Sequence, residues 1–345
     1  MKKSVLIIGG TRFVGRHIVK VGLEQGHDIT LFTRGQTNIH LFGDSFANIK
    51  HIVGDRRSDI AQLGELLGHK HWDVVIDTCG YIGREVAAST QWLRNRCKLY
   101  VFISSVSAYA SFAKPNDENS ALGRITDVET EVIDGRTYGP LKAHCESIVK
   151  AAFGDRALIV RPGLVVGPED YTDRFTYWVA RALRGGTIVA PERNDFPIQY
   201  IDARDLARFI WHCIYNAYSG IFNVVTPPGR DTLGDLIQNA RDFANVPSDV
   251  KWVSPELLEK NAISAWNDMP LWFAPKKDTV LGDMSHFMAS SNTKAIEHGL
   301  TCASLYNTVD VLANWFASEP IDRQQALKSG LSLQREEALL HSIHT

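Results

Sequence analysis

Three side chains in the middle of the chain have types and a spacing suited to proton transfer. Tyr138 and Lys142 are four residues apart in a segment that continues as a helical pattern, so they lie on one helix face, one turn apart. A nearby ammonium favours the ionised phenol and lowers its pKa from the ordinary value of about 10. Such a tyrosine can exchange a proton with a substrate oxygen, which Ser105 can also hydrogen-bond. The alternative is a chance Tyr–Lys pair on a helix surface.

A glycine-rich turn near the N-terminus has the pattern of a dinucleotide site. Gly9–Gly15 lies between a short apolar run and an amphipathic helical pattern. Gly9 permits a tight turn, and Gly15 lets the helix pack close to the strand. The N–H groups that open the helix can hold a pyrophosphate at its positive end. The residues expected to bind the cofactor here are Gly9, Thr11, Arg12, Phe13, Val14 and Gly15.

Two arginines bear on the choice of cofactor. Arg12 stands where a three-glycine version of the turn has its middle glycine, and the second apolar run ends at Thr33 and Arg34. NAD-preferring sites usually have a carboxylate at that end to bind the ribose 2′-hydroxyl. Arg12 and Arg34 can instead clamp a 2′-phosphate by charge-assisted hydrogen bonds. We therefore expect NADP, with NAD as the alternative if both arginines are merely solvated surface charges.

Further residues follow the later strands of this half. Asp55 is expected to touch the adenine with Arg56 beside it, and the Asp77–Tyr81 segment to lie near the ribose and phosphates. From this segment we assign Thr78, Cys79 and Gly80 to the cofactor. An aromatic stretch around Asp173–Trp178 resembles the lip of a substrate pocket. The residues expected to bind substrate are Tyr81, Ser107, Arg174 and Trp178.

Short apolar runs alternate with helical patterns over the first half of the chain. This alternation is typical of a parallel sheet covered by helices on both faces, and right-handed crossovers make it a doubly wound fold. The sequence therefore predicts an α/β protein with a Rossmann-type doubly wound parallel sheet. The expected strands are Val5–Ile8, Ile29–Phe32, Ile49–Val53, Val74–Ile76, Tyr100–Ile103 and Leu158–Val160.

The texture of the sequence changes after about residue 165. Six of the eight tryptophans lie beyond that point, and the strand–helix rhythm is lost. We expect a smaller, irregular C-terminal substrate domain over 166–197 and 226–320, with residues 1–165 forming the dinucleotide-binding domain. Within 198–225, the runs Ile198–Ile201 and Ile221–Val225 are expected to return to the main sheet. Residues 321–345 are expected to form a polar helical tail.

Composition narrows the function classes. The chain has 345 residues, 44% of them hydrophobic, and a formal net charge of −2, so it is an ordinary globular chain without the basic excess that nucleic-acid grip usually needs. Its five cysteines form no C-x-x-C pair, and its first apolar run is too short for a signal peptide or a membrane span. We expect a cytoplasmic protein with a small-molecule substrate, no nucleic-acid or membrane partner and no metal. A homodimer is an open possibility.

These motifs together resemble the short-chain dehydrogenase/reductase superfamily, in its extended branch, the NAD-dependent epimerase/dehydratase family. The motifs that match are the Gly9–Gly15 turn, Asp55, Ser104-Ser105, Tyr138-x-x-x-Lys142, Arg161-Pro162-Gly163 with Gly167-Pro168, and Ala203–Ala207. The resemblance implies that Tyr138 is the general acid/base and that Ser105 polarises the reacting oxygen. It also implies that Lys142 binds the nicotinamide ribose and that Pro162, Gly163 and Leu164 adjoin the cofactor.

Departures from the family pattern leave several functions open. Val106-Ser107 stands where sugar-nucleotide 4,6-dehydratases have Asp-Glu, and no Asn follows the sixth strand, as it does in many nucleotide-sugar epimerases. The leading prediction is an NAD(P)-dependent oxidoreductase that transfers a hydride between nicotinamide and a carbinol or keto carbon. One alternative is a nucleotide-sugar epimerase with tightly held NAD. Chloroplast RNA-binding family members share the Gly9–Phe13 style of turn, so a cofactor-binding RNA-interaction or regulatory protein is another alternative.

Overall fold

The chain divides into two compact units in a computed structural model that describes residues 1–37, 42–43, 49–57, 65, 67–68, 70–274 and 282–344. The first unit comprises Met1–Gly163, Ala203–Val225 and Ser290–Thr301. The second unit comprises Leu164–Asp202, Thr226–Ala289 and Cys302–Thr345. Among the residues described, no helix combines the length and the apolar character needed to cross a membrane.

The first unit is built on a seven-stranded parallel sheet with the order β11-β6-β5-β4-β1-β2-β3. The strand order reverses between β1 and β4, where open α/β sheets bind their ligands at the carboxyl ends of the strands. This topology confirms the doubly wound, Rossmann-type fold. The strands are β1 (Ser4–Ile8), β2 (Asp28–Thr33), β3 (Ile49–Val53), β4 (Trp72–Asp77), β5 (Cys97–Ile103), β6 (Ala157–Pro162) and β11 (Gly220–Val224).

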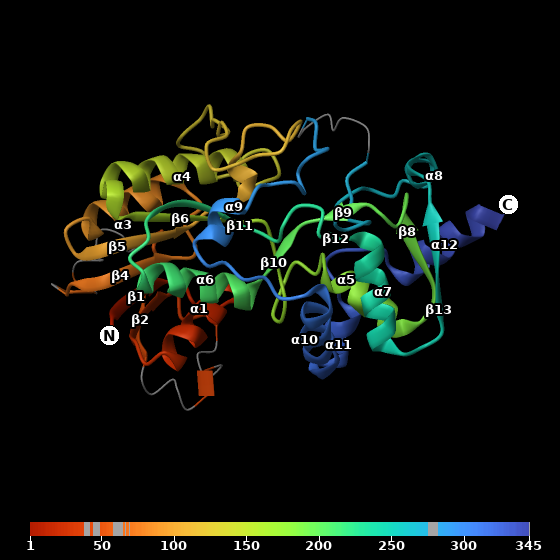
Figure 1. The fold of residues 1–345 in the computed structure, drawn as a ribbon, viewed down its shortest axis with the longest axis horizontal. Coiled ribbons are helices and arrows are strands. Elements are labelled where there is room, and N and C mark those ends of the chain that lie inside the picture. The colour runs from red at the N-terminus through yellow and green to blue at the C-terminus, as the bar shows by residue number, and fades with distance from the viewer. Residues whose placement is uncertain are drawn as a thin grey trace. The chain divides into compact units, whose positions relative to one another are not determined.

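Helices cover both faces of this sheet, α1 and α6 on one and α3 and α4 on the other (Figure 1). Central strands such as β1 are therefore buried on both sides, which explains their unbroken apolar runs. Close helix contacts depend on glycine: a Cβ on Gly22 of α1 would lie 2.4 Å from the Trp211 ring of α6. The helices of this unit are α1 (Phe13–Glu24), α3 (Gly83–Leu93), α4 (Tyr138–Phe153), α6 (Ala203–Tyr215) and α9 (Thr293–Glu297), with short 3₁₀ turns η3 (Val106–Ala108) and η4 (Gly154–Arg156).

The second unit has only two-stranded pairings among its described residues. β13 pairs in parallel with β8 and β10 with β7, whereas β12 pairs antiparallel with β9. Its strands are β7 (Leu164–Val166), β8 (Gly186–Pro191), β9 (Pro197–Ile198), β10 (Tyr200–Asp202), β12 (Asp231–Thr232) and β13 (Ser248–Val253). Its helices are α5 (Thr176–Arg184), α7 (Leu233–Ala244), α8 (Pro255–Lys260), α10 (Leu305–Ser318), α11 (Ile321–Gln325) and α12 (Leu333–His344).

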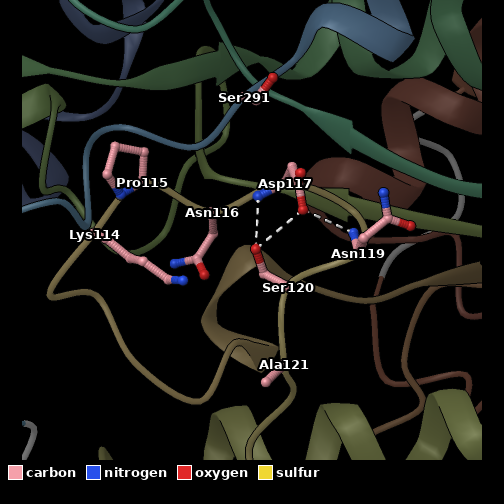
Figure 2. Close-up of a pocket in the computed structure, with 8 residues that line it drawn as sticks. All are labelled: Lys114, Pro115, Asn116, Asp117, Asn119, Ser120, Ala121 and Ser291. Carbon is pink, nitrogen blue, oxygen red and sulfur yellow. Dashed lines mark hydrogen bonds between the residues drawn. The ribbon is translucent and has the colours of Figure 1, made fainter.

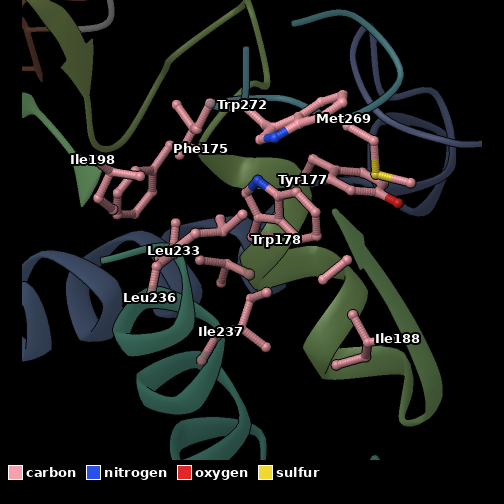
Figure 3. Packing of buried hydrophobic residues seen from close by; sticks show 14 of the residues in the cluster. Phe175, Tyr177, Trp178, Ile188, Ile198, Leu233, Leu236, Ile237, Met269 and Trp272 are labelled. Carbon is pink, nitrogen blue, oxygen red and sulfur yellow. The ribbon is translucent and has the colours of Figure 1, made fainter. Parts of the chain in front are cut away.

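A single apolar cluster forms the core of the second unit. Trp178, Tyr177 and Phe175 pack there with Leu233 and Ile237 of α7, as Figure 3 shows. Two ion pairs attach the C-terminal helices to this core: Arg181 of α5 binds Glu336 of α12 in a buried pair, and the buried Asp173 binds the half-buried Arg323 of α11. The expected tail therefore consists of two helices, of which α12 contributes the buried side chains of Glu336 and Leu339 to the interior of this unit.

The expectation that Ile198–Ile201 returns to the main sheet is wrong. Ile198 ends β9, which pairs with β12, and Tyr200 begins β10, which pairs with β7. Side-chain bonds hold this segment locally, since the Gln199 amide donates to Thr226 O and the Tyr200 hydroxyl donates to Asp231. Periodicity alone could not distinguish a short local pairing from a return to the large sheet. The run Ile221–Val225 does return, as β11 at the sheet edge.

Residues 290–301 belong to the first unit, although the sequence suggests placing them with the substrate domain. The Asn292 amide donates to Val225 O at 2.8 Å, and Lys294 Nζ of α9 donates to Ile221 O of the edge strand β11 at 2.8 Å. These contacts are made by polar side chains to backbone carbonyls. Hydrophobic patterning carries no signal for such contacts, which explains why the segment was assigned differently from sequence.

Candidate active site

Lys142 is held in a cradle of backbone carbonyls at the carboxyl ends of β4 and β5. Its Nζ donates to Gly80 O and to Ile103 O, each at 2.8 Å. The ammonium lies 4.2 Å from the centroid of the Tyr81 ring and 5.1 Å from that of Phe102. The side chain is only 2% exposed, and burial lowers the pKa of Lys142 to about 8. The cradle therefore fixes a cation whose charge is sensitive to pH just above neutrality.

Tyr138 is the first residue of α4, one turn before Lys142. Its ring centroid lies 6.3 Å from that of Tyr81, the ring over which the lysine ammonium sits. The next residue, Gly139, brings the helix start against η3, since a Cβ there would lie 2.0 Å from Ser107 O. Only glycine allows this approach. The structure thus brings four residues together at the carboxyl ends of β4 and β5: Tyr138, Tyr81, Lys142 and Ser107.

Ser105 lies between β5 and η3 with its hydroxyl oriented by the backbone. Its Oγ accepts a hydrogen bond from the Ser107 N–H at 3.1 Å, so its own proton is left to point elsewhere. The neighbouring Ser104 donates to Glu146 of α4 at 2.5 Å. Glu146 in turn receives two bonds from Arg161, at 2.9 and 2.6 Å. This buried pair anchors the end of β5 to α4 and to β6.

The glycine-rich turn has the backbone that a phosphate cradle requires. Gly9 and Gly10 have φ values of +94° and +98°, and a Cβ on Gly9 would lie 2.3 Å from Thr78 Oγ1. A Cβ on Gly15 would lie 2.7 Å from Gly10 Cα, so the helix packs directly on the turn. Arg12, the residue before α1, makes no side-chain cap for this helix, and the positive end of the helix dipole lies at the turn. The turn fits a dinucleotide pyrophosphate.

Arg12 and Arg34 are both exposed in the first unit. Arg12 Nε donates to Thr37 Oγ1 at 3.4 Å, which directs its side chain toward the segment that follows β2. Thr33, at the end of β2, hydrogen-bonds His51 of β3 at 2.8 Å and accepts the Gly35 N–H. No carboxylate lies between Ile29 and Gly35.

The residues assigned to the cofactor after β3 and β4 have different surroundings. Asp55 is half-buried, and its carboxylate accepts the Arg57 N–H at 2.9 Å. Thr78 and Cys79 both face Ile8 O, at 2.9 and 3.7 Å, which joins the end of β4 to the glycine turn. Burial raises the pKa of the Cys79 thiol.

The surroundings of the Arg56 side chain correct the prediction that this side chain contacts the cofactor. It is 7% exposed and is bound to Asp77 and Ser89 inside the unit, not presented to a ligand. A cation at a strand end resembles a phosphate ligand in sequence. Only the fold places two carboxylates, Asp77 and Glu85, around it.

The remaining predicted residues lie near or beyond the unit boundary. Pro162 ends β6, and Gly163 donates to Val224 O, with a Cβ position only 2.7 Å from Val225. Leu164 begins β7 of the second unit, where Arg174 lies half-buried over the Trp266 ring at 5.1 Å.

Trp178 does not have the surface that a substrate residue needs. It is fully buried in the core of the second unit (Figure 3). Its indole N–H donates to Pro270 O at 3.0 Å. The substrate role assigned to Trp178 is therefore corrected to a core role. Aromatic residues in a Gly-rich and Pro-rich stretch look alike in sequence whether they line a pocket or fill a core.

Sequence reasoning missed the buried polar residues that hold the site. Asp77 accepts bonds from Arg56, from the Cys79 N–H and from the Tyr100 hydroxyl. The sequence gives one usable signal: Asp77 follows the apolar run Val74–Ile76, and a charged residue buried at such a strand end needs a partner of opposite charge.

A surface pocket of the first unit lies elsewhere, on the loop after η3. Asn116 is buried there and its backbone carbonyl accepts the Ser291 N–H at 2.8 Å. None of the lining residues is among those predicted for cofactor or substrate. They are Lys114, Pro115, Asn116, Asp117, Asn119, Ser120, Ala121 and Ser291 (Figure 2).

Comparison with known proteins identifies the family. The sequence model of the NAD dependent epimerase/dehydratase family matches residues 5–224, well over half of the chain. The chain therefore belongs to this family, within the extended short-chain dehydrogenases/reductases.

Individual relatives are more distant. The chloroplast stem-loop binding protein of 41 kDa b from Arabidopsis thaliana is 28% identical over 234 residues, which cover 65% of this chain and 58% of that protein. The match thus spans less than two thirds of the relative's length.

Two solved structures share the fold. A putative epimerase from Burkholderia cenocepacia is 18% identical with a TM-score of 0.65, over 90% of this chain and 97% of that one. The UDP-glucuronic acid 4-epimerase from Bacillus cereus, solved with NAD, is 13% identical with a TM-score of 0.63, over 90% and 98%.

Proposed function

We propose that this protein is an NAD(P)-dependent oxidoreductase that moves a hydride between nicotinamide and a carbinol or keto carbon, with Tyr138 as general acid/base. The observation that carries the proposal is the Lys142 cradle. A buried ammonium is fixed by two carbonyls beside Tyr81, one helical turn from Tyr138. Burying a charge is costly unless the charge is hydrogen-bonded or paired, and groups whose pKa is perturbed in this way concentrate at active sites.

The chain's own residues have separate parts in this reaction. In the oxidative direction Tyr138 takes the proton of the substrate hydroxyl as the carbon gives up its hydride, and in the reductive direction it returns the proton to the carbonyl oxygen. Lys142 keeps a positive charge near the phenol, and Ser105 donates its hydroxyl proton to the substrate oxygen. When bound, the nicotinamide supplies the hydride acceptor or donor.

The test of this chemistry is Tyr138→Phe. It removes only the titrating oxygen, so turnover should fall about 10²- to 10⁴-fold while cofactor binding stays largely intact. The assay follows reduced-nicotinamide absorbance with carbonyl, carbinol and nucleotide-sugar substrates. Tyr215→Phe, at the exposed end of α6, is the control. Lys142→Met should damage both cofactor affinity and rate. Near-native turnover of Tyr138→Phe would refute the assignment.

We also propose a preference for NADP(H). The support is the pair of exposed arginines, Arg12 directed toward Thr37 and Arg34 at the end of β2, together with the lack of a carboxylate there. A 2′-phosphate would gain charge-assisted hydrogen bonds that each contribute roughly 1.5–3 kcal/mol. The predicted oxidoreductase would then use NADPH as reductant or NADP⁺ as oxidant.

Titration calorimetry with both cofactors tests the preference. NADP(H) should bind more tightly than NAD(H), and Arg34→Ala should lose much of the difference while sparing NAD(H). Lys20→Ala removes a cation from the exposed side of α1 and controls for net charge. Equal or tighter binding of NAD(H) by the native protein would mean that the two arginines are surface charges only.

Two other functions have specific support. The family match and the NAD-bound epimerase from Bacillus cereus favour a nucleotide-sugar epimerase, for which the purified protein should retain NAD through gel filtration. The Arabidopsis relative named as a stem-loop binding protein favours an RNA-interaction role. Mobility-shift titration with stem-loop RNA over a range of salt tests this role, and the presence of Ser105, Tyr138 and Lys142 favours the enzyme.

A further inference from the structure

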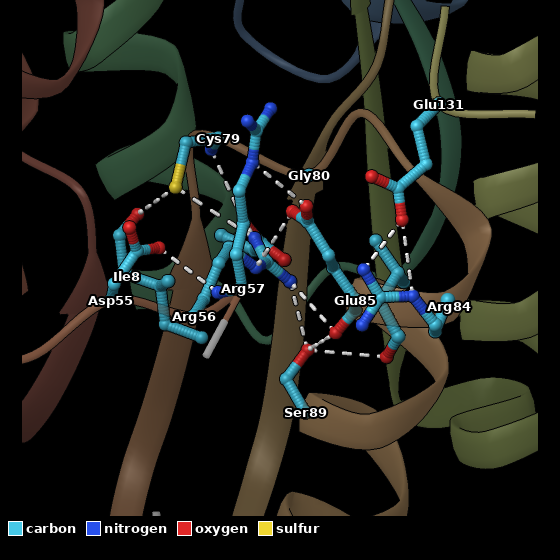
Figure 4. Close-up of polar contacts among 12 residues, drawn as sticks. Ile8, Asp55, Arg56, Arg57, Cys79, Gly80, Arg84, Glu85, Ser89 and Glu131 are labelled. Atoms are coloured by element: carbon cyan, nitrogen blue, oxygen red, sulfur yellow. Dashed lines mark hydrogen bonds and ion pairs between the residues drawn. The ribbon is translucent and has the colours of Figure 1, made fainter. Parts of the chain in front are cut away.

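A buried cluster of charged side chains lies where β3 and β4 end in the first unit (Figure 4). Arg56 follows β3, Asp77 ends β4, and Glu85 and Ser89 lie on α3. Arg56 Nη1 donates to Asp77 at 2.7 Å and Nη2 to Ser89 at 2.9 Å, while Nε lies 3.7 Å from Glu85. None of the four residues is more than 7% exposed. Arg57 Nε also lies 3.1 Å from Glu85, so two guanidinium groups neutralise the two buried carboxylates and hold the cluster in a defined geometry.

Asp77 connects this cluster to the turn that follows β4. Its Oδ1 accepts both Arg56 and the Cys79 N–H, the latter at 3.1 Å, and its Oδ2 accepts the Tyr100 hydroxyl at 2.9 Å. The next residue, Gly80, is closely confined, since a Cβ there would lie 2.6 Å from the Phe102 ring. The bond from the Cys79 N–H to Asp77 and the close packing of Gly80 on Phe102 therefore both restrict the backbone that carries the Gly80 carbonyl.

The Gly80 carbonyl is one wall of the lysine cradle. It accepts Lys142 Nζ at 2.8 Å, and the adjacent Tyr81 ring lies 4.2 Å from the same ammonium. Hydrogen bonds and the short backbone stretch Cys79–Gly80 thus connect Arg56, through Asp77, to Lys142. Proton transfer by Tyr138 does not by itself need this connection.

We propose that Asp77, held by Arg56 and Tyr100, is a positioning residue. It places the Gly80 carbonyl against the Lys142 ammonium, and its carboxylate counters the positive charge of that ammonium. The inference rests on the proposed function, in which Lys142 binds cofactor and supports Tyr138. Asp77 touches neither substrate nor cofactor in this role. It acts through the turn and through its field at the ammonium.

Titratable groups on three elements lie around Lys142. Burial, the largest cause, lowers the pKa of Lys142; Cys145 of α4 and Asp77 and Cys79 of the β4 turn raise it, and Arg56 lowers it. Tyr81 and Phe102 supply ring faces, and Tyr138 lies one turn away. Asp77 and Arg56 therefore act on the ammonium with opposite sign. A merely structural role for the pair would give both variants the same direction, because loosening the cluster exposes the lysine in either case.

The first test measures the titration of Lys142 directly and needs no substrate. Isotope-labelled lysine side chains are followed by NMR against pH, with Lys142→Met for assignment. Asp77→Asn should move the Lys142 midpoint down by about one unit and Arg56→Gln should move it up by a similar amount. Shifts in one common direction, or no shift, would overturn the proposal.

Milder variants keep the test valid if these two fail to fold. Ser89 and Thr90 are neighbours on α3, both buried, and both hydroxyls donate to carbonyls of their own helix. Only Ser89 also accepts from Arg56. Ser89→Ala and Tyr100→Phe should shift the Lys142 midpoint, and Thr90→Ala should not. An equal effect of Ser89→Ala and Thr90→Ala would contradict the proposed path.

The second test asks whether Asp77 acts through the lysine in cofactor binding. Asp77→Asn should weaken NADPH about tenfold in the native background and cause little further loss in Lys142→Met. Additive losses would overturn the proposal. If Lys142→Met itself leaves NADPH affinity unchanged, the lysine's cofactor role in the proposed function fails. The NMR titration then still decides whether Asp77 and Arg56 set the cradle.

Discussion

The ion pairs of the two units lie in different places and do different things. In the first unit, the ion pairs Arg56–Asp77 and Arg161–Glu146 lie at strand ends beside the candidate active site. In the second unit, Arg181–Glu336 and Arg323–Asp173 join residues about 150 positions apart in sequence. The parallel sheet already holds the first unit together, so its charges are available to shape the site. The second unit has only two-stranded pairings among its described residues, and its ion pairs connect distant segments.

The two units should therefore respond differently when an ion pair is broken. A broken pair in the first unit should disturb the cofactor site as well as stability. A broken pair in the second unit should release the C-terminal helices and leave the glycine-rich turn alone.

The largest expected effect comes from neutralising one carboxylate in each unit. Glu336→Gln leaves the buried Arg181 guanidinium without its counter-charge, and Glu146→Gln does the same to Arg161. Each change should lower the free energy of unfolding by about 3–5 kcal/mol. Chemical denaturation measures the loss. Titration with NADPH separates the two variants, because Glu336→Gln should keep native affinity and Glu146→Gln should not. Equal losses of affinity would break the distinction between the units.

Replacing Asp170 in the second unit should have a smaller effect, and it should raise the free energy of unfolding where the two changes above lower it. Burial, the largest cause, raises its pKa from 3.8 to about 6, and Oδ2 has no hydrogen-bond partner within the part of the chain that the structure describes. The folded state then binds this proton more tightly than the unfolded state, so stability falls as pH rises from 3.8 to about 6. Asp170→Asn should be about 1–3 kcal/mol more stable than the native protein at neutral pH.

The gain from Asp170→Asn should vanish below pH 3.8, where the native carboxyl is protonated in both states. Asp242→Asn, an exposed acid of α7 in the same unit, is the control and should change little. A gain that does not depend on pH would mean that the charge at position 170 is not its cause.

Two glycines of α1 sharpen the comparison within the first unit. Gly15→Ala forces a Cβ to 2.7 Å from Gly10 Cα, and Gly22→Ala forces one to 2.4 Å from the Trp211 ring. Both should lower the free energy of unfolding by about 1–3 kcal/mol through overpacking. Only Gly15→Ala should also weaken NADPH binding, because it displaces the phosphate turn. Calorimetry of both variants with NADPH tests this, and matching affinities would argue against a cofactor role for the turn.

The smallest effect is a pH dependence that originates in the first unit. The His27 ring stacks on Trp211 with centroids 4.6 Å apart, and its Nδ1 accepts the Lys3 N–H at 3.2 Å. Burial, with the charge of Lys3, lowers the pKa of His27 below 6.5. The unfolded chain therefore takes this proton first, and stability should decline by up to about 1 kcal/mol as pH falls through 6.5.

His27→Gln should flatten that decline, as measured by thermal unfolding at several pH values. An unchanged slope would assign the dependence to other groups. His51, whose pKa burial also lowers, is the next candidate in the same unit.

The sequence alone was enough to predict the approximate place of each of the seven strands of the main sheet, although it also assigned Ile198–Ile201 to that sheet wrongly. A strand buried on both faces must be apolar throughout, so the apolar runs Val5–Ile8 and Tyr100–Ile103 predict two such strands. The glycine turn and the Tyr138–Lys142 spacing were equally readable, since backbone geometry and helix periodicity are local properties. The catalytic roles of these residues and the preference for NADP stay predictions.

Only the tertiary structure decided which charged and aromatic side chains face inward. Arg56 and Trp178 looked like ligand contacts in sequence, and the fold buries one among carboxylates and the other in a core. The Gly80 and Ile103 carbonyls form one lysine cradle because β4 and β5 end side by side. Periodicity reports whether a residue is buried within its own element. It cannot report which distant segment supplies the partner, because that depends on contacts between residues far apart in the chain.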